Sequence, residues 1–285
     1  MKKNILILAA AFCSLTALSS CDDDVVTHRV APSFIDKDTP SDAQPMNTEI
    51  GSGWKLEFSD EFNDGWVNLN KWVVKDESRG ARTNLGIKEW FFKPQNVAEE
   101  DGNLVLKVTK VGNDVCHCSS VYSNGKYTMK YGYAEARIKN ADINKAICTS
   151  FWLQSNNMSH VDGTGNDGAE IDIFESAYVG NHTMTTIHID GSSTNHQELN
   201  NRYDADNLFG DYHVWGMLWN ENEIKVYYDG QLKATIDDPK WIPQVREYLY
   251  LSTIITFCGQ GDFKSQPADS HLTSAYVDYV RVWTR

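Results

Sequence analysis

Residues 168–176 read GAEIDIFES, and this stretch decides both the fold and the chemistry that the sequence indicates. Glu170 and Asp172 are two residues apart, so on a β-strand their side chains point to the same face. The isoleucines that alternate with them would face the opposite way, into a hydrophobic layer. Glu175 would follow the isoleucines unless a β-bulge near residues 173–174 adds one residue and returns it to the acidic face. The segment therefore predicts a bulged strand that carries three carboxylates in one row.

Three carboxylates in one row destabilise a fold unless something uses their charge. Hydrolysis of a glycosidic bond is one such use, because a retaining enzyme places a nucleophile and an acid/base about 5–5.5 Å apart. Four residues along a strand span roughly 13 Å, so the two glutamate side chains would have to lean together, or the bulge would have to shorten the path. On spacing alone, a calcium site and a solvated row of acids remain as alternatives.

Short alternating strands with turn signals fill most of the chain. Residues 223–228 and 231–236 flank Asp229-Gly230, a dipeptide typical of a tight hairpin turn. Further segments rich in β-formers are residues 104–109, 131–139 and 276–283. There is no long amphipathic helix, although residues 239–245 would accommodate one short helical turn. This pattern predicts an all-β protein built as one large sandwich or barrel.

The N-terminus resembles the leader of a bacterial lipoprotein. Residues 1–20 have a basic start and a mostly apolar stretch that is too short to span a bilayer, which predicts a signal peptide. The sequence LSSC that ends at Cys21 is typical of a lipobox, so we expect lipidation of Cys21, with ordinary cleavage as the alternative. Residues 21–50 contain prolines and polar residues without periodicity and predict a flexible tether. Because the acidic run Asp22-Asp23-Asp24 resembles a surface-export signal, we expect an outer-membrane lipoprotein of a Gram-negative bacterium that faces the cell surface, with a solvated tail as the alternative for this run.

The overall charge narrows the class of ligand. The chain has 39 acidic and 26 basic residues, which gives a formal net charge of −13. Such a surface repels phosphate backbones, so we expect no nucleic-acid partner. It also disfavours a heavily sulfated glycan, unless a local basic patch overrides the mean charge. Nine tryptophans and 13 tyrosines offer rings that fill cores but that also stack on flat apolar faces of ligands.

The cysteines allow several interpretations. Cys116-His117-Cys118 resembles a metal motif, but no matching second pair accompanies it, so the signal for zinc is weak. Export permits a disulfide bond among Cys116, Cys118, Cys148 and Cys258. The sequence does not choose the pairing, and buried thiols are the alternative.

EIDIFE at residues 170–175 is similar to the E-[I/L]-D-x-x-E signature of glycoside hydrolase family 16, which includes laminarinases, agarases, porphyranases and endo-β-galactosidases. Other stretches that resemble the family, in its order, are residues 58–62, 71–72, 96–97, 100–106, 131–137, 150–153, 212–219 and 277–282. The resemblance implies a β-jelly-roll sandwich of two antiparallel sheets, whose concave sheet forms the glycan-binding cleft. We assign residues 51–285 to this catalytic domain.

The resemblance also implies roles for individual residues. Glu170 would be the nucleophile, Glu175 the general acid/base and Asp172 the assisting carboxylate. Trp152 would lie under the cleft as a sugar platform, with a core tryptophan as the alternative. His188 matches a family histidine near the reactive sugar, with a structural histidine as the alternative.

Two further sets of positions follow from the same resemblance. Trp90 lies where an N-terminal cleft loop would offer a stacking surface, although a hydrophobic core run explains it equally well. The chemistry requires no cofactor, but members of the family often hold a structural calcium ion (Ca²⁺) on the convex face. The positions that match its ligands are Asp278, Glu61 and Gly102.

The sequence departs from the laminarinase pattern at two places. Cys148-Thr149 replaces the Trp-Pro that precedes the A-F-W strand, and residues 251–262 lack the tryptophan of a Gly-Gly-x-Trp loop. We therefore expect a monomeric, endo-acting, retaining hydrolase of neutral β-linked glucans or galactans. An endo-β-galactosidase for mucin-type or keratan-type glycans, a glycan-binding lipoprotein without turnover, and a transglycosylase are the alternatives.

Overall fold

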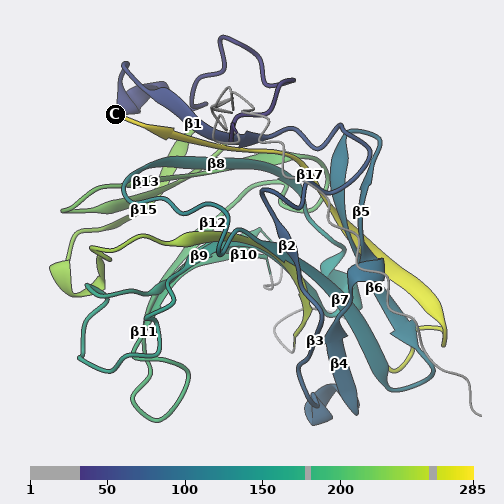
Figure 1. The fold of residues 1–285 in the computed structure, drawn as a ribbon. Helices are drawn as coiled ribbons and strands as arrows, with labels where there is room; N and C mark the ends of the chain where they lie inside the picture. Colours follow the sequence, from purple (N-terminus) through teal and green to yellow (C-terminus); the bar gives the residue numbers. More distant parts are fainter. Residues whose placement is uncertain (1–32, 177–180, 257–261) are drawn as a thin grey trace, which may run out of the picture. The chain divides into compact units, whose positions relative to one another are not determined.

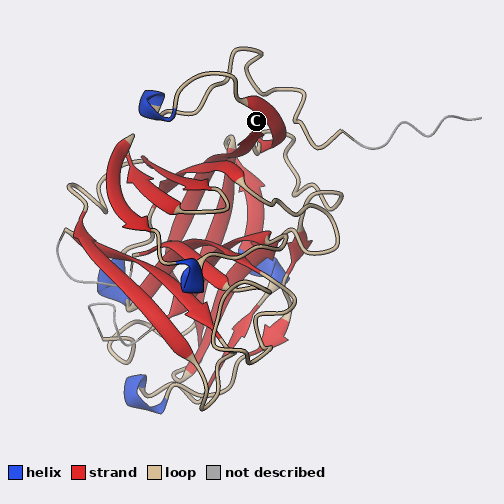
Figure 2. Cartoon of the chain, turned by 90° about the vertical axis from the view of Figure 1, so that its left-hand side faces the viewer, coloured by secondary structure: helices blue, strands red, loops and turns tan. Residues whose placement is uncertain are grey.

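The computed structural model describes residues 33–176, 181–256 and 262–285, so the leader 1–20, Cys21 and Cys258 lie outside the described residues. The described part forms two curved layers of strands, one nested under the other (Figure 1). Helical structure among these residues is limited to short 3₁₀ turns (Figure 2), and none of it is long and apolar enough to cross a membrane. The prediction of an all-β sandwich is confirmed.

The outer layer consists of β1 (Lys55–Asp60), β5 (Val97–Glu100), β6 (Asn103–Val111), β8 (Gly132–Lys139), β13 (His213–Trp219), β14 (Ile224–Tyr228), β15 (Gln231–Ile236) and β17 (Ser270–Thr284). Its order is β15-β14-β13-β8-β17. The edge of β17 that faces away from β8 pairs with β6 along the first part of the strand and with β1 along the last part. The β14–β15 turn has Asp229 at φ 47° and Gly230 at φ 75°. Both positive angles fit the tight hairpin turn that the sequence predicts.

The inner layer consists of β2 (Val73–Val74), β7 (Val115–Tyr122), β9 (Ile147–Gln154), β10 (Glu170–Glu175), β11 (His182–Ile189), β12 (Gln197–Asp204) and β16 (Tyr248–Ile255). Its order is β12-β11-β10-β9-β16-β7-β2. The first half of β7 leaves this layer and pairs with β6 and with β4 (Glu89–Phe92), which also pairs with β3 (Glu77–Ser78). The 3₁₀ turns are η1 (Thr48–Ile50), η2 (Thr83–Leu85), η3 (Pro94–Asn96), η4 (Ile143–Lys145) and η5 (Pro239–Trp241).

The core lies between the two layers and holds β10 in place. Ile171, Ile173 and Phe174 are fully buried. The Phe174 ring stacks on Trp215 of β13, with centroids 3.9 Å apart and planes 10° apart. Aromatic stacking of this kind adds about 0.5–1.5 kcal/mol to the burial of the rings. The acidic strand is therefore fixed to the outer layer by its apolar side chains.

Residues 33–50, which the sequence predicts to be flexible tether, instead pack on the outer layer. The backbone N–H of Met46 donates to Oε2 of Glu135 at 2.8 Å, and Nε1 of Trp283 donates to the carbonyl of Ala43 at 3.3 Å. This cover leaves Glu135, which the alternating pattern places on a polar face, only 1% exposed. The sequence shows no periodicity here because the segment is held by single anchoring contacts and not by a ladder of strand pairs.

Candidate active site

The concave face of the inner layer carries a cavity of about 320 Å³. Alternate residues of three adjacent strands line its floor, since their neighbours in sequence point into the core. The lining comprises Ser150, Trp152 and Gln154 of β9, Glu170, Asp172 and Glu175 of β10, Tyr250, Ser252 and Ile254 of β16, and Lys75, Arg79, Arg82, Trp90, Phe92 and Ser192 at its sides. This volume suits a small number of sugar rings, because ligand sites usually begin at about 300 Å³.

A β-bulge brings the third carboxylate into this cavity. Against β9, Asp172 pairs with Trp152 and Phe174 pairs with Phe151, so the residue between them has no partner position. The register against β11 shifts at the same place, between Asp172 and Glu175. As a result Phe174 enters the core while Glu175 returns to the cavity face. The extra residue is the one that the sequence predicts.

The pKa of Glu170 is raised above its usual value, but three neighbouring groups oppose the increase. Burial raises its pKa, and the nearby charge of Glu175 adds to that increase. The charge of His188, a hydrogen bond from Nε2 of Gln154 at 2.8 Å and the charge of Arg79 all lower the pKa of Glu170. Three groups thus favour its charged form, which is the form that a nucleophile needs.

Glu175 has the environment of a protonated acid. Burial and the charges of Asp172 and Glu198 raise its pKa to about 8, and only His188 opposes them. The two glutamates therefore differ in the number of groups that stabilise their charge. Such a difference suits the two members of a carboxyl pair to different roles in proton transfer.

Asp172 lies between the two glutamates on the strand. Its carboxylate Oδ2 is 3.1 Å from Nε2 of His188, and carboxylate oxygens of Glu170 and Asp172 lie within 4.8 Å of one another and of that imidazole. Burial, and next the charge of Glu170, raise the pKa of Asp172 well above its usual value. Asp172 can thus orient His188 and modulate the charge of Glu170.

Aromatic side chains form the floor and one side of the cavity. Trp152 stacks on Tyr250 with ring centroids 3.8 Å apart and planes 5° apart, and its Nε1 donates to Ser252 at 3.1 Å. Trp90 lines the side wall but is only 2% exposed. Trp152 therefore contributes its ring to the floor of the cavity, whereas Trp90 mainly supports its neighbours.

Sequence reasoning missed two parts of the site. The first is a chain of two hydrogen bonds that ends at Glu170 of β10. The hydroxyl of Tyr248 donates to Oε1 of Gln154 at 2.8 Å, and Gln154 in turn donates to Glu170. Nothing in the local sequence marks this pair, because β16 and β9 become neighbours only through the sheet register.

The second missed part is a positively charged side wall made of Lys75, Arg79 and Arg82. Glu77 pairs with Lys75 at 3.0 Å and with Arg79 at 2.7 Å. Arg82 forms no ion pair with the described residues, and its buried Nε lacks a hydrogen-bond partner among them. The spacing of the three cations in KDESRGAR, residues 75–82, was the available signal.

The predicted calcium residues gather on the outer layer, but the two carboxylates among them are bound by arginines. Glu61, Gly102 and Asp278 line one cavity together with Arg137. Both carboxylate oxygens of Glu61 accept hydrogen bonds from Arg281, at 2.9 and 2.7 Å, and Oδ2 of Asp278 accepts one from Arg137 at 2.7 Å. Two guanidinium groups already neutralise the carboxylates that would attract the ion, so this arrangement does not fit calcium.

The motif Cys116-His117-Cys118 is a strand segment and not a metal centre. Both thiols are buried with their sulfur atoms 3.8 Å apart, while His117 alternates to the other face of β7 and packs on Phe91. The three potential ligands therefore do not converge.

Comparisons with known proteins agree with this geometry. Residues 54–285 match the family model described as Beta-porphyranase A-D, GH16 domain. The chain is 25% identical over 282 residues to glucan endo-1,3-beta-glucosidase A1 of Niallia circulans (88% of this chain, 41% of the relative). It is 27% identical over 293 residues to keratan-sulfate endo-1,4-beta-galactosidase of Sphingobacterium multivorum (98% of this chain, 66% of the relative). The chain thus spans about two fifths and two thirds of these two relatives.

The solved structures show the same fold. A structure reported with endo-acting O-glycanases of the human gut microbiota that initiate mucin breakdown aligns with a TM-score of 0.66 and 24% identity, and covers 81% of this chain and 91% of its own. The laminarinase catalytic domain of Thermotoga maritima aligns with a TM-score of 0.65 and 23% identity, and covers 82% of this chain and 99% of its own. These structures share the sandwich fold, and the family match over residues 54–285 shows that the chain belongs to glycoside hydrolase family 16, as a domain of the β-porphyranase A–D type.

Proposed function

We propose that the protein is an endo-acting, retaining glycoside hydrolase that cleaves β-linked glycans of the galactan type. The observation that carries this proposal is the bulge in β10, because it directs two glutamates of different charge preference into one aromatic-floored cavity. The family model is named for β-porphyranases, and one relative is named an endo-1,4-β-galactosidase, which favours galactans over glucans. The missing tryptophan of the laminarinase loop supports the same choice.

Two carboxyl groups that face one cavity are the groups that a double displacement requires. An Oε of Glu170 attacks the anomeric carbon while Glu175 gives its proton to the glycosidic oxygen, so the bond to the leaving sugar breaks and a glycosyl ester forms. Glu175, now a carboxylate, takes a proton from water, and the resulting hydroxide attacks the anomeric carbon. The ester bond breaks, Glu170 is released as a carboxylate and the product keeps the original configuration. If a second sugar replaces water in this step, the outcome is transglycosylation.

Paired substitutions test the assignment. Glu170→Gln and Glu175→Gln each keep the size of the side chain, so both should abolish cleavage while binding of the oligosaccharide survives. New reducing ends measured across a panel of agarose, porphyran, keratan-type and mucin-type glycans, β-1,3-glucan and mixed-linkage glucan report cleavage. Hydrolysis retained by either variant would refute its role, and the absence of product from every glycan would favour a binding lipoprotein without turnover.

The charged wall favours a second candidate, a galactan with anionic substituents. The net charge of −13 predicts a neutral glycan, yet Lys75, Arg79 and Arg82 line the cavity, and Glu77 pairs with only the first two of them. Arginine binds sulfate-like and carboxylate groups through paired N–H donors. A matched pair of sulfated and desulfated keratan separates the candidates: a neutral preference predicts faster cleavage of the desulfated chain.

We also propose that Cys21 carries a lipid that anchors the protein to the outer membrane with the domain at the cell surface. The support is the LSSC sequence and the acidic run after it. Cys21→Ala should release the protein from the membrane fraction, and protease added to whole cells should digest the wild-type protein. Persistence of the variant in the membrane fraction would refute lipid anchoring, and resistance of the wild-type protein in whole cells would refute surface exposure.

A further inference from the structure

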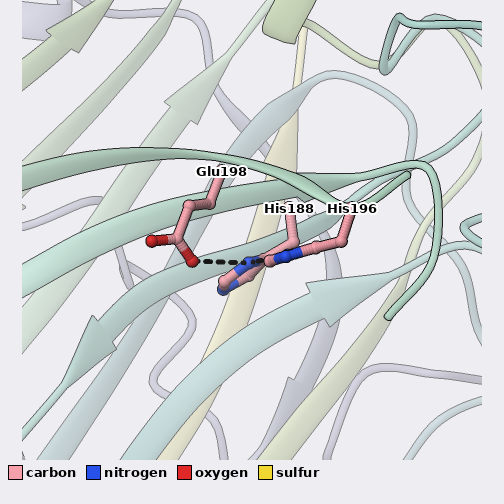
Figure 3. A group of neighbouring side chains, drawn as sticks. All are labelled: His188, His196 and Glu198. Atoms are coloured by element: carbon pink, nitrogen blue, oxygen red, sulfur yellow. Dashed lines mark hydrogen bonds and ion pairs between the residues drawn. The ribbon is translucent and has the colours of Figure 1, made fainter. Parts of the chain in front are cut away.

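A cluster of two histidines and one glutamate lies beside the carboxylate row, at the turn between β11 and β12. Nδ1 of His188 is 2.8 Å from Nε2 of His196 and 3.7 Å from Oε2 of Glu198. Figure 3 shows the three side chains directed toward one point, with the two imidazoles next to each other. The hydrolytic steps above use neither His196 nor Glu198.

The fold fixes this convergence. His188 and Glu198 are directly opposite each other in the β11–β12 ladder, so their side chains share one face. The turn that carries His196 is tied down by Asp190, whose carboxylate accepts from the backbone N–H groups of Asp162 and Gly163 and from Gln197. The three donor atoms therefore meet without any rearrangement of the chain.

We propose that His188, His196 and Glu198 bind a divalent transition-metal ion, for which zinc (Zn²⁺) is the probe. Two imidazole nitrogens and one carboxylate oxygen are a typical three-residue zinc set that leaves a position open to water. Calcium and magnesium prefer sets made only of oxygen atoms, so the imidazoles select against them.

The distances suit an ion after a small movement. Zinc–nitrogen bonds of about 2.0–2.1 Å in tetrahedral geometry place two nitrogens about 3.3 Å apart. Nδ1 of His188 is 2.8 Å from Nε2 of His196 and 3.7 Å from Oε2 of Glu198. Each distance differs from that value by about half an ångström or less. Rotation of the side chains supplies this, because that of Glu198 is 48% exposed.

Asp172 completes the arrangement on the other side of the ring. Its Oδ2 lies 3.1 Å from Nε2 of His188. In the tautomer that carries its proton on Nε2, this N–H donates to the carboxylate and the lone pair of Nδ1 points to the cluster. Histidines that bind metals commonly donate their second N–H to a carboxylate in this way. A bound ion would fix the imidazole that Asp172 contacts, so zinc should slow hydrolysis, a consequence that rests on the proposed function.

Zinc titration of the purified mature chain, without an affinity tag, tests the proposal. Calorimetry should show one zinc ion per chain, and His196→Ala and Glu198→Gln should each weaken binding by at least about tenfold. A second, more exposed group of similar composition, His160 with Asp162 and Asp167, provides the matched control, so His160→Ala should leave the affinity unchanged. Unchanged affinity in His196→Ala, or loss in His160→Ala instead, overturns the site.

Hydrolysis gives the second readout, with each variant compared with its own rate without zinc. Zinc should inhibit the wild-type enzyme and should inhibit His196→Ala only at roughly tenfold higher concentration. Equal inhibition of both overturns the link between the ion and Asp172. If no glycan is cleaved but the calorimetric pattern holds, the hydrolase proposal fails and the metal site stands.

Discussion

Replacing Glu175 by glutamine should stabilise the protein, and the gain should grow with pH. Burial and the charges of Asp172 and Glu198 raise the pKa of Glu175 from 4.5 to about 8, against the effect of His188. Between these values the unfolded chain loses the proton and the folded protein keeps it, so the free energy of unfolding falls as pH rises. Glutamine has no proton to lose, so the variant escapes this penalty.

The magnitude follows from the two pKa values. At pH 5 the unfolded chain gains about 0.8 kcal/mol from ionisation of this glutamate, and at pH 7 it gains about 3.4 kcal/mol. The stability advantage of Glu175→Gln over the wild-type protein should thus increase by about 2.5 kcal/mol between pH 5 and pH 7. This value is an upper estimate, since it treats the group as titrating alone.

Urea unfolding at pH 5, 6 and 7 measures the difference. Glu100, whose side chain is 52% exposed and lies outside the cavity, gives the matched control, and Glu100→Gln should show no comparable growth. A gap between Glu175→Gln and wild type that stays constant from pH 5 to pH 7 would mean that Glu175 is not held protonated, and the general-acid assignment would lose its physical basis.

The remaining predictions concern the rate, the core, the support of Glu170 and the outer layer. Cleavage of a natural glycan should fall above about pH 8 as Glu175 loses its proton, whereas a glycoside with an activated leaving group should lack this alkaline limb; identical profiles would contradict the role. Phe174→Ala should cost about 3–5 kcal/mol of stability by urea unfolding, because the ring is fully buried on Trp215; a cost below about 1 kcal/mol would be incompatible with that packing. Gln154→Leu should raise the pKa of Glu170 and move the acidic limb of the pH–rate profile to higher pH; an unmoved limb would show that this hydrogen bond does not stabilise the charge. Calcium added to protein that has been freed of metal ions should leave the melting temperature unchanged, since guanidinium groups neutralise Glu61 and Asp278; a rise of several degrees would show a bound calcium ion.

The sequence predicted those features that depend on local pattern. Glu170 and Glu175 are an odd number of residues apart, and one inserted residue is the simplest way to place both on one face of a strand. The bulge could therefore be predicted from the sequence. The β14–β15 hairpin could also be predicted from local sequence, because Asp229-Gly230 adopts the positive φ angles that the turn requires.

Features that depend on pairing between distant segments could not be predicted from the sequence. The link from Tyr248 through Gln154 to Glu170 exists only because β16 and β10 flank β9. The guanidinium of Arg281 reaches Glu61 for the same reason, across the β1–β17 pair. Neither the spacing of residues nor their composition reports such contacts.

The anchoring of residues 33–50 has a practical consequence for shortened versions of the enzyme. The family match begins at Trp54, so a natural choice would be to start the polypeptide there. That cut would remove the residues that cover Tyr133, Trp283 and Glu135. The buried carboxylate of Glu135 would also lose the backbone N–H that donates to it. The family match and the folded unit therefore begin at different residues. A chain that starts at residue 54 would lose activity because its outer layer is damaged, so such a loss would say nothing about the catalytic residues.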